Sequence, residues 1–304
     1  MAMIFIYAQS APAASELAGF ARENGYESTA LCFSSDQADA LASSGADRVL
    51  CFSGESQRPE SYAGQVAQLL TDRSCALFLV SASARARELA AMVAGRLEWP
   101  MANDVLEAAL RPEGVIVKRM MYGGAVVQTE CYSGPAVLVV PEGKFTPCSG
   151  GTAAVETIDG VPDLAVRTTL LTAIDSAGGA DLASAERVVS FGLGLGSIDA
   201  LPKVQALADA LSAELACSRP AAEEKHWLDS ARYVGISNLS LKPNLYLMLG
   251  ISGQMQHMAG VRDAKIIVAV NTDEKALVFR SADYGIVGDL NEFIPAMLRA
   301  LGKS

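Results

Sequence analysis

Hydrophobic and polar positions alternate in blocks along the first part of the chain, where short apolar runs are separated by amphipathic segments. The apolar runs have the composition expected of strands buried on both faces of a parallel sheet. They are Met3–Tyr7, Ser28–Phe33, Arg48–Phe52 and Cys75–Val80. The segments between them have helical periodicity and are Ala14–Glu23, Asp36–Ser43, Tyr62–Leu70 and Ala82–Leu97. This alternation is typical of βαβ units and predicts an α/β domain.

The pattern then changes to strands joined by short turns that contain glycine or proline. These strands are Leu106–Leu110, Val115–Tyr122, Ala125–Cys131 and Ala136–Val140. Short connections join antiparallel neighbours, whereas parallel strands need a longer crossover. The segment therefore predicts antiparallel hairpins added to the first domain.

A second strand–helix series begins near Arg187. Its apolar segments are Val188–Phe191, Tyr233–Ile236, Leu245–Gly250, Lys265–Val270 and Ala276–Phe279, and helices are expected at Leu201–Glu214, from Ser252 onward and at Asn291–Leu301. The two series are separated by a stretch rich in small and polar residues, which is typical of a linker. Its apolar middle, Leu164–Leu171, is expected to pair with a neighbouring segment.

The predicted fold class is therefore α/β, with two Rossmann-like parallel-sheet α/β domains, the first with added antiparallel hairpins. The expected boundaries are 1–145 for the first domain, 146–186 for the linker and 187–304 for the second domain.

Composition narrows the class of protein. Hydrophobic residues make up 51% of the chain and charged residues 19%, enough apolar material for packed cores and too much for a disordered chain. The 34 acidic residues outnumber the 24 basic ones, and the net charge of −10 disfavours nucleic acid and anionic membranes as partners. The six cysteines have no metal-site spacing, and two histidines are too few for a histidine-rich metal site. No basic leader and no apolar stretch of bilayer length is visible, so we expect a soluble cytoplasmic protein without a metal.

The first candidate site is a glycine-rich turn, Gly192–Gly196, between an expected strand and an expected helix. Backbone amides in that position can hold a phosphate. The spacing is G-x-G-x-G, however, whereas the dinucleotide fingerprint is G-x-G-x-x-G. A plain strand-to-helix turn therefore remains an alternative.

The second candidate site follows the strand at Leu245–Gly250. Ser252 is expected to cap a helix and Gly253 to leave its first amides open to an anion, with His257 within reach of the same ligand. The alternative is an ordinary cap and a buried histidine. Other expected strands also end in polar residues, namely Ser218, Arg219, Ser237, Asn238 and Asn271. No nucleophile–base pair or paired carboxylates are found, so no catalytic residue is predicted.

Several strings in the second half together resemble the α subunit of electron transfer flavoproteins. They are Ser218–Pro220, Gly235–Ser237, Lys242–Tyr246, Gly250–His257, Val270–Asn271 and Ala282–Leu290. The resemblance is dense over residues 187–301 and looser before that, where Arg119–Ala125 is similar to the bacterial branch connected with anaerobic carnitine and related acyl-CoA reduction.

The resemblance implies an electron carrier without substrate turnover of its own, which pairs through its first domain with a homologous β subunit and holds one FAD in its second domain. Electrons would pass between a flavin dehydrogenase, of the acyl-CoA type, and another redox partner. Around the flavin ring it implies Ser218, Arg219, Val234, Gly235, Ile236 and Ser237. For the pyrophosphate, ribityl chain and ring O2 it implies Ser252, Gly253, Gln254, Met255, Gln256 and His257, and for the adenosine Asn271, Asp289 and Leu290.

Three positions depart from the family pattern: Ile236 and Asn238 replace the more common Gln and Gly around Ser237, and the third departure bears on the phosphates. Leu193 stands where the family usually has an arginine, so a cation that would clamp the phosphates is missing. Two other functions stay open on the residues alone: a nicotinamide-dependent oxidoreductase that uses Gly192–Gly196, and an assembly subunit without a cofactor.

Overall fold

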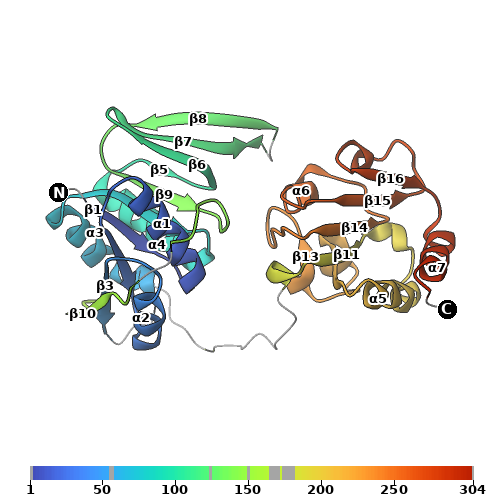
Figure 1. Ribbon diagram of the computed structural model, residues 1–304, viewed down its shortest axis with the longest axis horizontal. Coiled ribbons are helices and arrows are strands. Elements are labelled where there is room, and N and C mark those ends of the chain that lie inside the picture. Colours follow the sequence, from blue (N-terminus) through green and yellow to red (C-terminus); the bar gives the residue numbers. More distant parts are fainter. Residues whose placement is uncertain are drawn as a thin grey trace. The chain divides into compact units, whose positions relative to one another are not determined.

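The computed structural model describes residues 3–54, 58–122, 125–148, 151–163, 172 and 182–302. The chain divides into two compact units, Met1–Thr172 and Ala173–Ser304. Both contain a parallel sheet with helices, so the predicted fold class is confirmed (Figure 1). The predicted pairing of Leu164–Leu171 lies outside the described residues.

The first unit is built around a seven-stranded sheet in the order β10-β3-β2-β1-β4-β9-β5, in which all neighbours are parallel. Its strands are β1 (Met3–Tyr7), β2 (Ser28–Cys32), β3 (Arg48–Ser53), β4 (Cys75–Ser81), β5 (Met101–Ala102), β9 (Ala136–Val140) and β10 (Ala154–Asp159). The helices are α1 (Ala11–Glu23), α2 (Ser35–Ala42), α3 (Ala63–Asp72) and α4 (Ala84–Leu97). Helices α1 and α2 pack on one face of the sheet, and α3 and α4 on the other.

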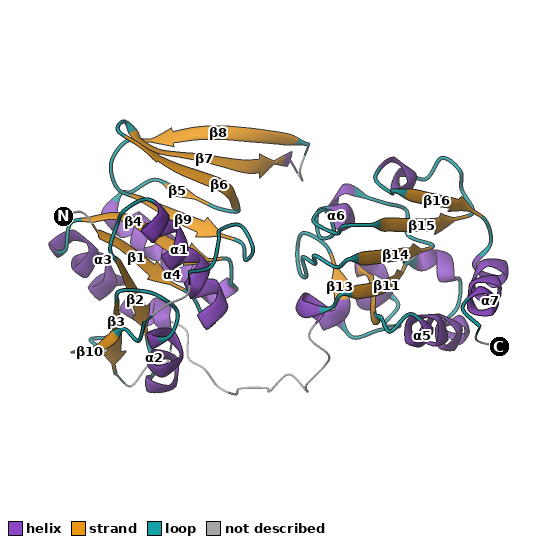
Figure 2. Ribbon diagram, in the orientation of Figure 1, coloured by secondary structure: helices purple, strands orange, loops and turns teal. Residues whose placement is uncertain are grey.

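Two predictions for this unit are wrong. Strand β9 does not belong to a hairpin: all five of its residues are buried, and it pairs in parallel with β4 and β5. The antiparallel sheet holds only β6 (Val105–Arg111), β7 (Gly114–Met121) and β8 (Val126–Tyr132), as Figure 2 shows. Strand β10 lies within the expected linker, yet it pairs with β3 over six residues because its β-branched residues extend the edge of the sheet.

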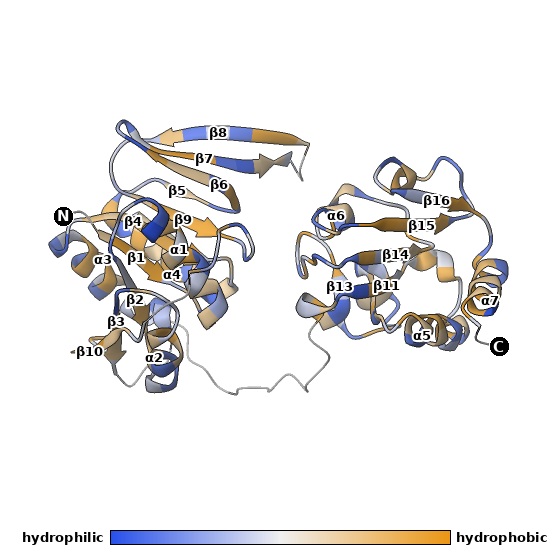
Figure 3. Cartoon of the chain, viewed as in Figure 1, coloured by the Kyte–Doolittle hydropathy of each residue, from blue (hydrophilic) through white to orange (hydrophobic). Residues whose placement is uncertain are grey.

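The second unit has a six-stranded parallel sheet in the order β13-β12-β11-β14-β15-β16. Its strands are β11 (Arg187–Phe191), β12 (Glu214–Ser218), β13 (Tyr233–Val234), β14 (Leu245–Leu249), β15 (Ile267–Asn271) and β16 (Tyr284–Val287). Apolar residues concentrate in the central strands (Figure 3). Helices α5 (Leu201–Ala210) and α7 (Leu290–Ala300) pack on one face, and short segments including α6 (Met255–Met258) lie on the other. The strand order reverses direction between β11 and β14, which is where ligands bind in such sheets.

Three expected elements of this unit end or begin elsewhere. The helix expected at Leu201–Glu214 ends at Ala210, because Ser212 has a left-handed φ of 49° and Glu214 starts β12. The helix expected from Ser252 starts only at Met255, since Gly253 has a φ of +80°. The apolar segment at Ala276–Phe279 largely forms a 3₁₀ turn, Leu277–Arg280, and the edge strand is β16.

Candidate functional site

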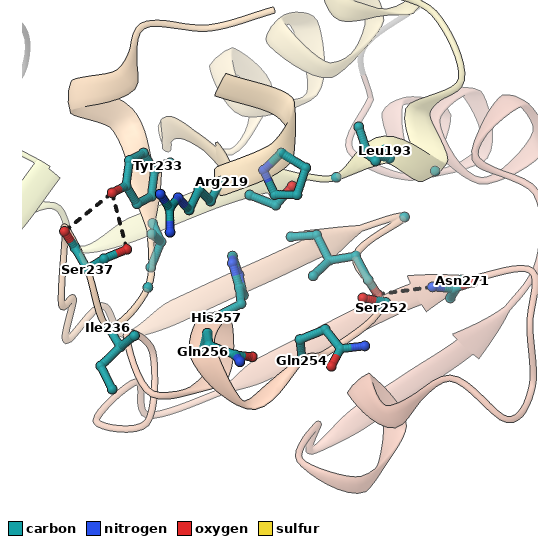
Figure 4. A pocket seen from close by; sticks show the side chains of 18 residues that line it. Leu193, Arg219, Tyr233, Ile236, Ser237, Ser252, Gln254, Gln256, His257 and Asn271 are labelled. Carbon is teal, nitrogen blue, oxygen red and sulfur yellow. Dashed lines mark hydrogen bonds between the residues drawn. The ribbon is translucent and has the colours of Figure 1, made fainter. Parts of the chain in front are cut away.

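A cavity of about 660 Å³ opens at the carboxyl ends of the strands of the second unit (Figure 4). Its walls come from the segments that follow β11, β12, β13, β14 and β15, so one edge of the sheet supplies nearly every contact. The lining residues are Gly192, Leu193, Gly194, Ser218, Arg219, Pro220, Tyr233, Val234, Gly235, Ile236, Ser237, Gly250, Ile251, Ser252, Gln254, Gln256, His257 and Asn271. The volume is within the usual range of about 300–1,000 Å³ for small-molecule sites.

The glycine-rich turn after β11 packs backbone to backbone against the turn after β14. The N–H of Gly192 donates to the Leu249 carbonyl at 2.9 Å, and the N–H of Gly194 donates to the Gly250 carbonyl at 3.0 Å. A Cβ on Gly194 would lie 2.7 Å from Gly250 Cα, so a side chain does not fit at this crossing. The N–H groups of Leu195 and Gly196 also donate to carbonyls within the turn. These four amides are therefore not available to a phosphate, and the Leu193 N–H, which donates to no acceptor among the described residues, is a single donor and not the cradle of successive amides considered for Gly192–Gly196.

In the loop after β14 the arrangement is reversed. Here carbonyl groups accept hydrogen bonds from the protein, whereas successive N–H groups donate none and are open to a ligand. Asn271 Nδ2 donates to the Ile251 carbonyl at 3.0 Å, and the Val278 N–H donates to the Ser252 carbonyl at 3.1 Å. Within the described residues, the N–H groups of 251–254 donate to no acceptor. Gly253 permits this conformation, since a Cβ there would collide with the Val278 backbone. Consecutive open amides form a concavity suited to an anion.

Ser252 itself is not the helix cap that the sequence predicts. Gln254 occupies the N-cap position of α6, and its side chain makes no capping hydrogen bond. Ser252 instead lines the cavity beside the open amides (Figure 4).

Arg219 is the cationic side chain of the cavity within the described part of the chain. It follows β12 directly, its side chain is 61% exposed, and its Nε donates to Glu223 Oε2 at 2.5 Å. That hydrogen bond raises the pKa of the Arg219 guanidinium above its already high ordinary value. The site therefore holds a permanent positive charge that is partly balanced by a carboxylate.

His257 forms the floor of the cavity and is 7% exposed. Its Nε2 lies 3.1 Å from the hydroxyl of Tyr246, while its buried Nδ1 has no hydrogen-bond partner among the described residues. Burial lowers the pKa of His257 to about 4, an effect only partly opposed by the backbone of Val234. The imidazole is therefore neutral near neutral pH and has one N–H to donate.

The loop after β13 brings a hydroxyl to the other side of the cavity. The N–H of Ile236 donates to the Gln256 carbonyl at 2.8 Å, which ties this loop to α6. The hydroxyl of Tyr233 lies 3.2 Å from Ser237 Oγ and 3.3 Å from the Ser237 carbonyl (Figure 4). Ser237 is thereby held on the cavity wall.

Most of the site residues expected from the sequence converge on this cavity. Those that line it are Ser218, Arg219, Val234, Gly235, Ile236, Ser237, Ser252, Gln254, Gln256, His257 and Asn271. Four do not: Gly253 packs on Val278, Met255 is 53% exposed, Asp289 caps α7 through the Asn291 N–H at 2.7 Å, and Leu290 belongs to the core.

Sequence reasoning did not assign Tyr233, Pro220 or Ile251 to the site. Each is adjacent to an assigned residue at a strand end, so extending each strand-end string by one residue would have found them.

Comparisons with known proteins agree with this geometry. Residues 8–163 match the Electron transfer flavoprotein domain, and residues 181–262 match the Electron transfer flavoprotein FAD-binding domain. The chain is 36% identical over 306 residues to YdiR of Escherichia coli strain K12, a protein named as an electron transfer flavoprotein subunit, with 99% of this chain and 98% of YdiR covered. It is 38% identical over 266 residues to the protein FixB of Salmonella typhimurium, with 85% of each chain covered. The chain therefore belongs to the electron transfer flavoprotein family as an α-type member, and the cofactor of its second unit is FAD.

Proposed function

We propose that this chain is the FAD-carrying α subunit of a heterodimeric electron transfer flavoprotein, which passes electrons between a dehydrogenase of the acyl-CoA type and a further redox partner. On this proposal the chain carries electrons and converts no substrate of its own. FAD supplies the redox chemistry, and the protein supplies binding, orientation and the electrostatic surroundings. The observation that carries the proposal is the cavity at the sheet reversal, with open amides on one side and a cation and a neutral N–H donor on the other.

The residues present suit the parts of FAD. A pyrophosphate is an anion that accepts hydrogen bonds, which is what the open amides of 251–254 and the Ser252 hydroxyl offer. A flavin ring gains electron density on reduction, and Arg219 and His257 offer it a positive charge and a hydrogen-bond donor. Ser218, Ser237 and the 234–236 backbone are proposed to orient the ring, and Gln254 and Gln256 the ribityl chain.

The adenosine is proposed to lie toward β15 and β16. Asn271 ends β15 at the cavity, and its carbonyl accepts from the Gly288 N–H at 3.0 Å, which joins the ends of the two strands. Asp289 and Leu290 follow directly. Because Leu290 is buried in the core, we propose its backbone as the contact and not its side chain.

The geometry disfavours a nicotinamide-dependent oxidoreductase. That function would place a pyrophosphate on the Gly192–Gly196 turn, where the amides of Gly192, Gly194, Leu195 and Gly196 already donate to protein carbonyls. It would also use an acidic residue at the carboxyl end of the second strand to bind the ribose. Glu214 instead starts β12, and Ser218 ends it.

Family membership supports the proposal for the partner, and the cysteines support the proposal for the compartment. Members of the α-type family normally pair with a β subunit, and we infer that the first unit, which extends through β10, forms the pairing domain here while the second unit holds FAD. The cysteines at 32, 51, 75, 131, 148 and 217 are free thiols, which fits a reducing compartment such as the cytoplasm. Separately, no helix within the described ranges is both long and apolar enough to cross a bilayer.

The test is to purify the chain together with its β subunit, denature the complex and quantify the released cofactors. We expect the denatured complex to release FAD, in an amount that changes when the cavity residues of this chain are changed. Ser252→Ala should lower the FAD content, whereas Met255→Ala, an exposed neighbour outside the cavity, should not. Release of NAD or of no cofactor from an intact complex would refute the proposal, and equal losses in both variants would refute the assigned site.

A further inference from the structure

A fully buried hydroxyl, that of Tyr246, lies next to His257 of the candidate FAD site. Tyr246 lies in β14 with 0% exposure, and its hydroxyl is 3.1 Å from Nε2 of His257. The two ring centroids are 6.0 Å apart. Tyr246 does not line the cavity, so it can act on a bound ligand only through His257.

The direction of this hydrogen bond decides which nitrogen of His257 carries the proton. A neutral imidazole has one N–H donor and one acceptor nitrogen. If Nε2 held the proton, it would donate to the phenolic oxygen, and the phenolic hydrogen would need another acceptor. Among the described residues, His257 Nε2 is the partner that lies within hydrogen-bond distance of the Tyr246 hydroxyl. A buried O–H without an acceptor is destabilising, so the arrangement in which Tyr246 donates to Nε2 is favoured.

Ser190 is the other hydroxyl near the phenol and has to be considered as an acceptor. It lies on the adjacent strand β11, and its side chain lowers the pKa of Tyr246, which is the effect of a hydroxyl that donates to the phenolic oxygen and not of one that accepts from it. Its buried Oγ has no partner at hydrogen-bond distance among the described residues. Burial raises the pKa of Tyr246 above its ordinary value, which keeps the phenol protonated and able to donate. The geometry therefore leaves His257 as the partner of the phenol.

We propose that Tyr246 is a positioning residue, which holds the proton of His257 on Nδ1 by donating its own hydrogen to Nε2. The consequence for the cofactor, unlike the tautomer itself, rests on the proposed function. Nδ1 is buried and has no partner at hydrogen-bond distance among the described residues, so a ligand acceptor would have to reach the floor of the cavity to accept the N–H fixed there. A cation is not needed for this, because the donor is the neutral ring.

The test measures the tautomer directly by NMR of the full chain carrying ¹⁵N-labelled histidine. The chain has two histidines, and His226→Gln identifies the resonances of His257. We expect the wild type to carry its ring proton on Nδ1. Tyr246→Phe should shift the tautomer ratio toward Nε2–H by about fivefold, which corresponds to one hydrogen bond of about 1 kcal/mol. Ser190→Ala removes a neighbouring buried hydroxyl and should leave the tautomer unchanged.

The same variants are then examined in the FAD-loaded complex. Tyr246→Phe should lower the potential at which the flavin accepts its first electron, and Ser190→Ala should not. A wild-type proton on Nε2 overturns the proposal even if Tyr246→Phe does not fold, and so does a ratio that Tyr246→Phe leaves unchanged. If the proton is on Nδ1 but no FAD binds at this cavity, the proposed function fails and the role of Tyr246 toward His257 stands.

Discussion

Replacing Leu193 by arginine should tighten FAD binding by about fivefold. Leu193 lies on the rim of the cavity, 43% exposed, in the turn after β11. The amides of Gly192, Gly194, Leu195 and Gly196 donate to protein carbonyls, so apart from the Leu193 N–H a side chain is the means by which this turn can reach a phosphate. An arginine at Leu193 would add a fixed positive charge to a cavity whose present cation, Arg219, is paired with Glu223.

The magnitude follows from the exposure of this position. A hydrogen bond to a charged group contributes about 1.5–3 kcal/mol, whereas an exposed ion pair contributes about 0.2–1 kcal/mol. Because Leu193 is close to half exposed, we expect a gain between these ranges, about 1 kcal/mol, and a tenfold change in affinity corresponds to about 1.4 kcal/mol. The gain should shrink at high salt, since the screening length falls from about 10 Å at 0.1 M to about 3 Å at 1 M.

The assay is titration of the cofactor-free heterodimer with FAD, followed by the loss of flavin fluorescence on binding. Leu193→Gln is the matched control, because it adds a polar side chain without a charge. The reasoning is refuted if Leu193→Arg binds FAD no more tightly than Leu193→Gln, or if its advantage is the same at low and high salt.

Three further predictions concern the same unit. Arg219→Ala should lower the reduction potential of the flavin for its first electron while most FAD is retained. Glu223→Gln should raise that potential, because Arg219 loses its counter-charge. Spectroelectrochemical titrations in which both variants shift the potential in the same direction would contradict this. The pKa of His257 is about 4 in the folded chain against 6.5 ordinarily, so the unfolded state binds the proton first as the pH falls. The free energy of unfolding should therefore fall by about 2 kcal/mol between about pH 7 and pH 5. In denaturant titrations over this pH range, His257→Gln should remove most of that fall. Gly194→Ala should lower the melting temperature of the complex and its FAD content, whereas Gly288→Ala, whose Cβ would meet its nearest neighbour at 4.0 Å, should lower neither.

The elements that the sequence predicted well are those defined by local patterns. Strand β1 and strand β9 begin and end where the apolar runs do, because buried parallel strands need apolar residues on both faces. The partners of β9 could not be predicted in this way, since pairing is set by contacts distant in sequence. Only the carboxyl end of strand β12 was recognised, from the polar residues after a short apolar run; its start at Glu214 was assigned to the preceding helix, because no glycine or proline separates the two. Strand β16 was missed because it is an exposed edge strand of only four residues, with Gly285 among them.

The candidate site shows the same division between local and distant information. Polar residues such as Ser218 and Asn271 were found because they end apolar runs, and parallel strands bring their ends to one edge. The contact of Tyr246 with His257 could not be found, because a tyrosine inside an apolar strand looks like any other core residue. The pairing of Arg219 with Glu223 has helical spacing and was visible in principle, but the segment did not resemble a helix.

The role that the sequence predicts for the glycine-rich turn differs from its role in the fold, and the difference affects the candidate FAD site. Read alone, Gly192–Gly196 offers amides to a phosphate; in the fold, the amides of Gly192 and Gly194 hold the turn after β14 in place. A Cβ at Gly194 would push against the Gly250 backbone, and overpacking of this kind costs about 1–3 kcal/mol. Since Gly250 leads into the open amides of 251–254, any displacement at the crossing moves the groups that would hold the pyrophosphate. The glycines of one turn thus set the position of the anion site on the next, which is why Gly194→Ala is expected to weaken both folding and FAD binding.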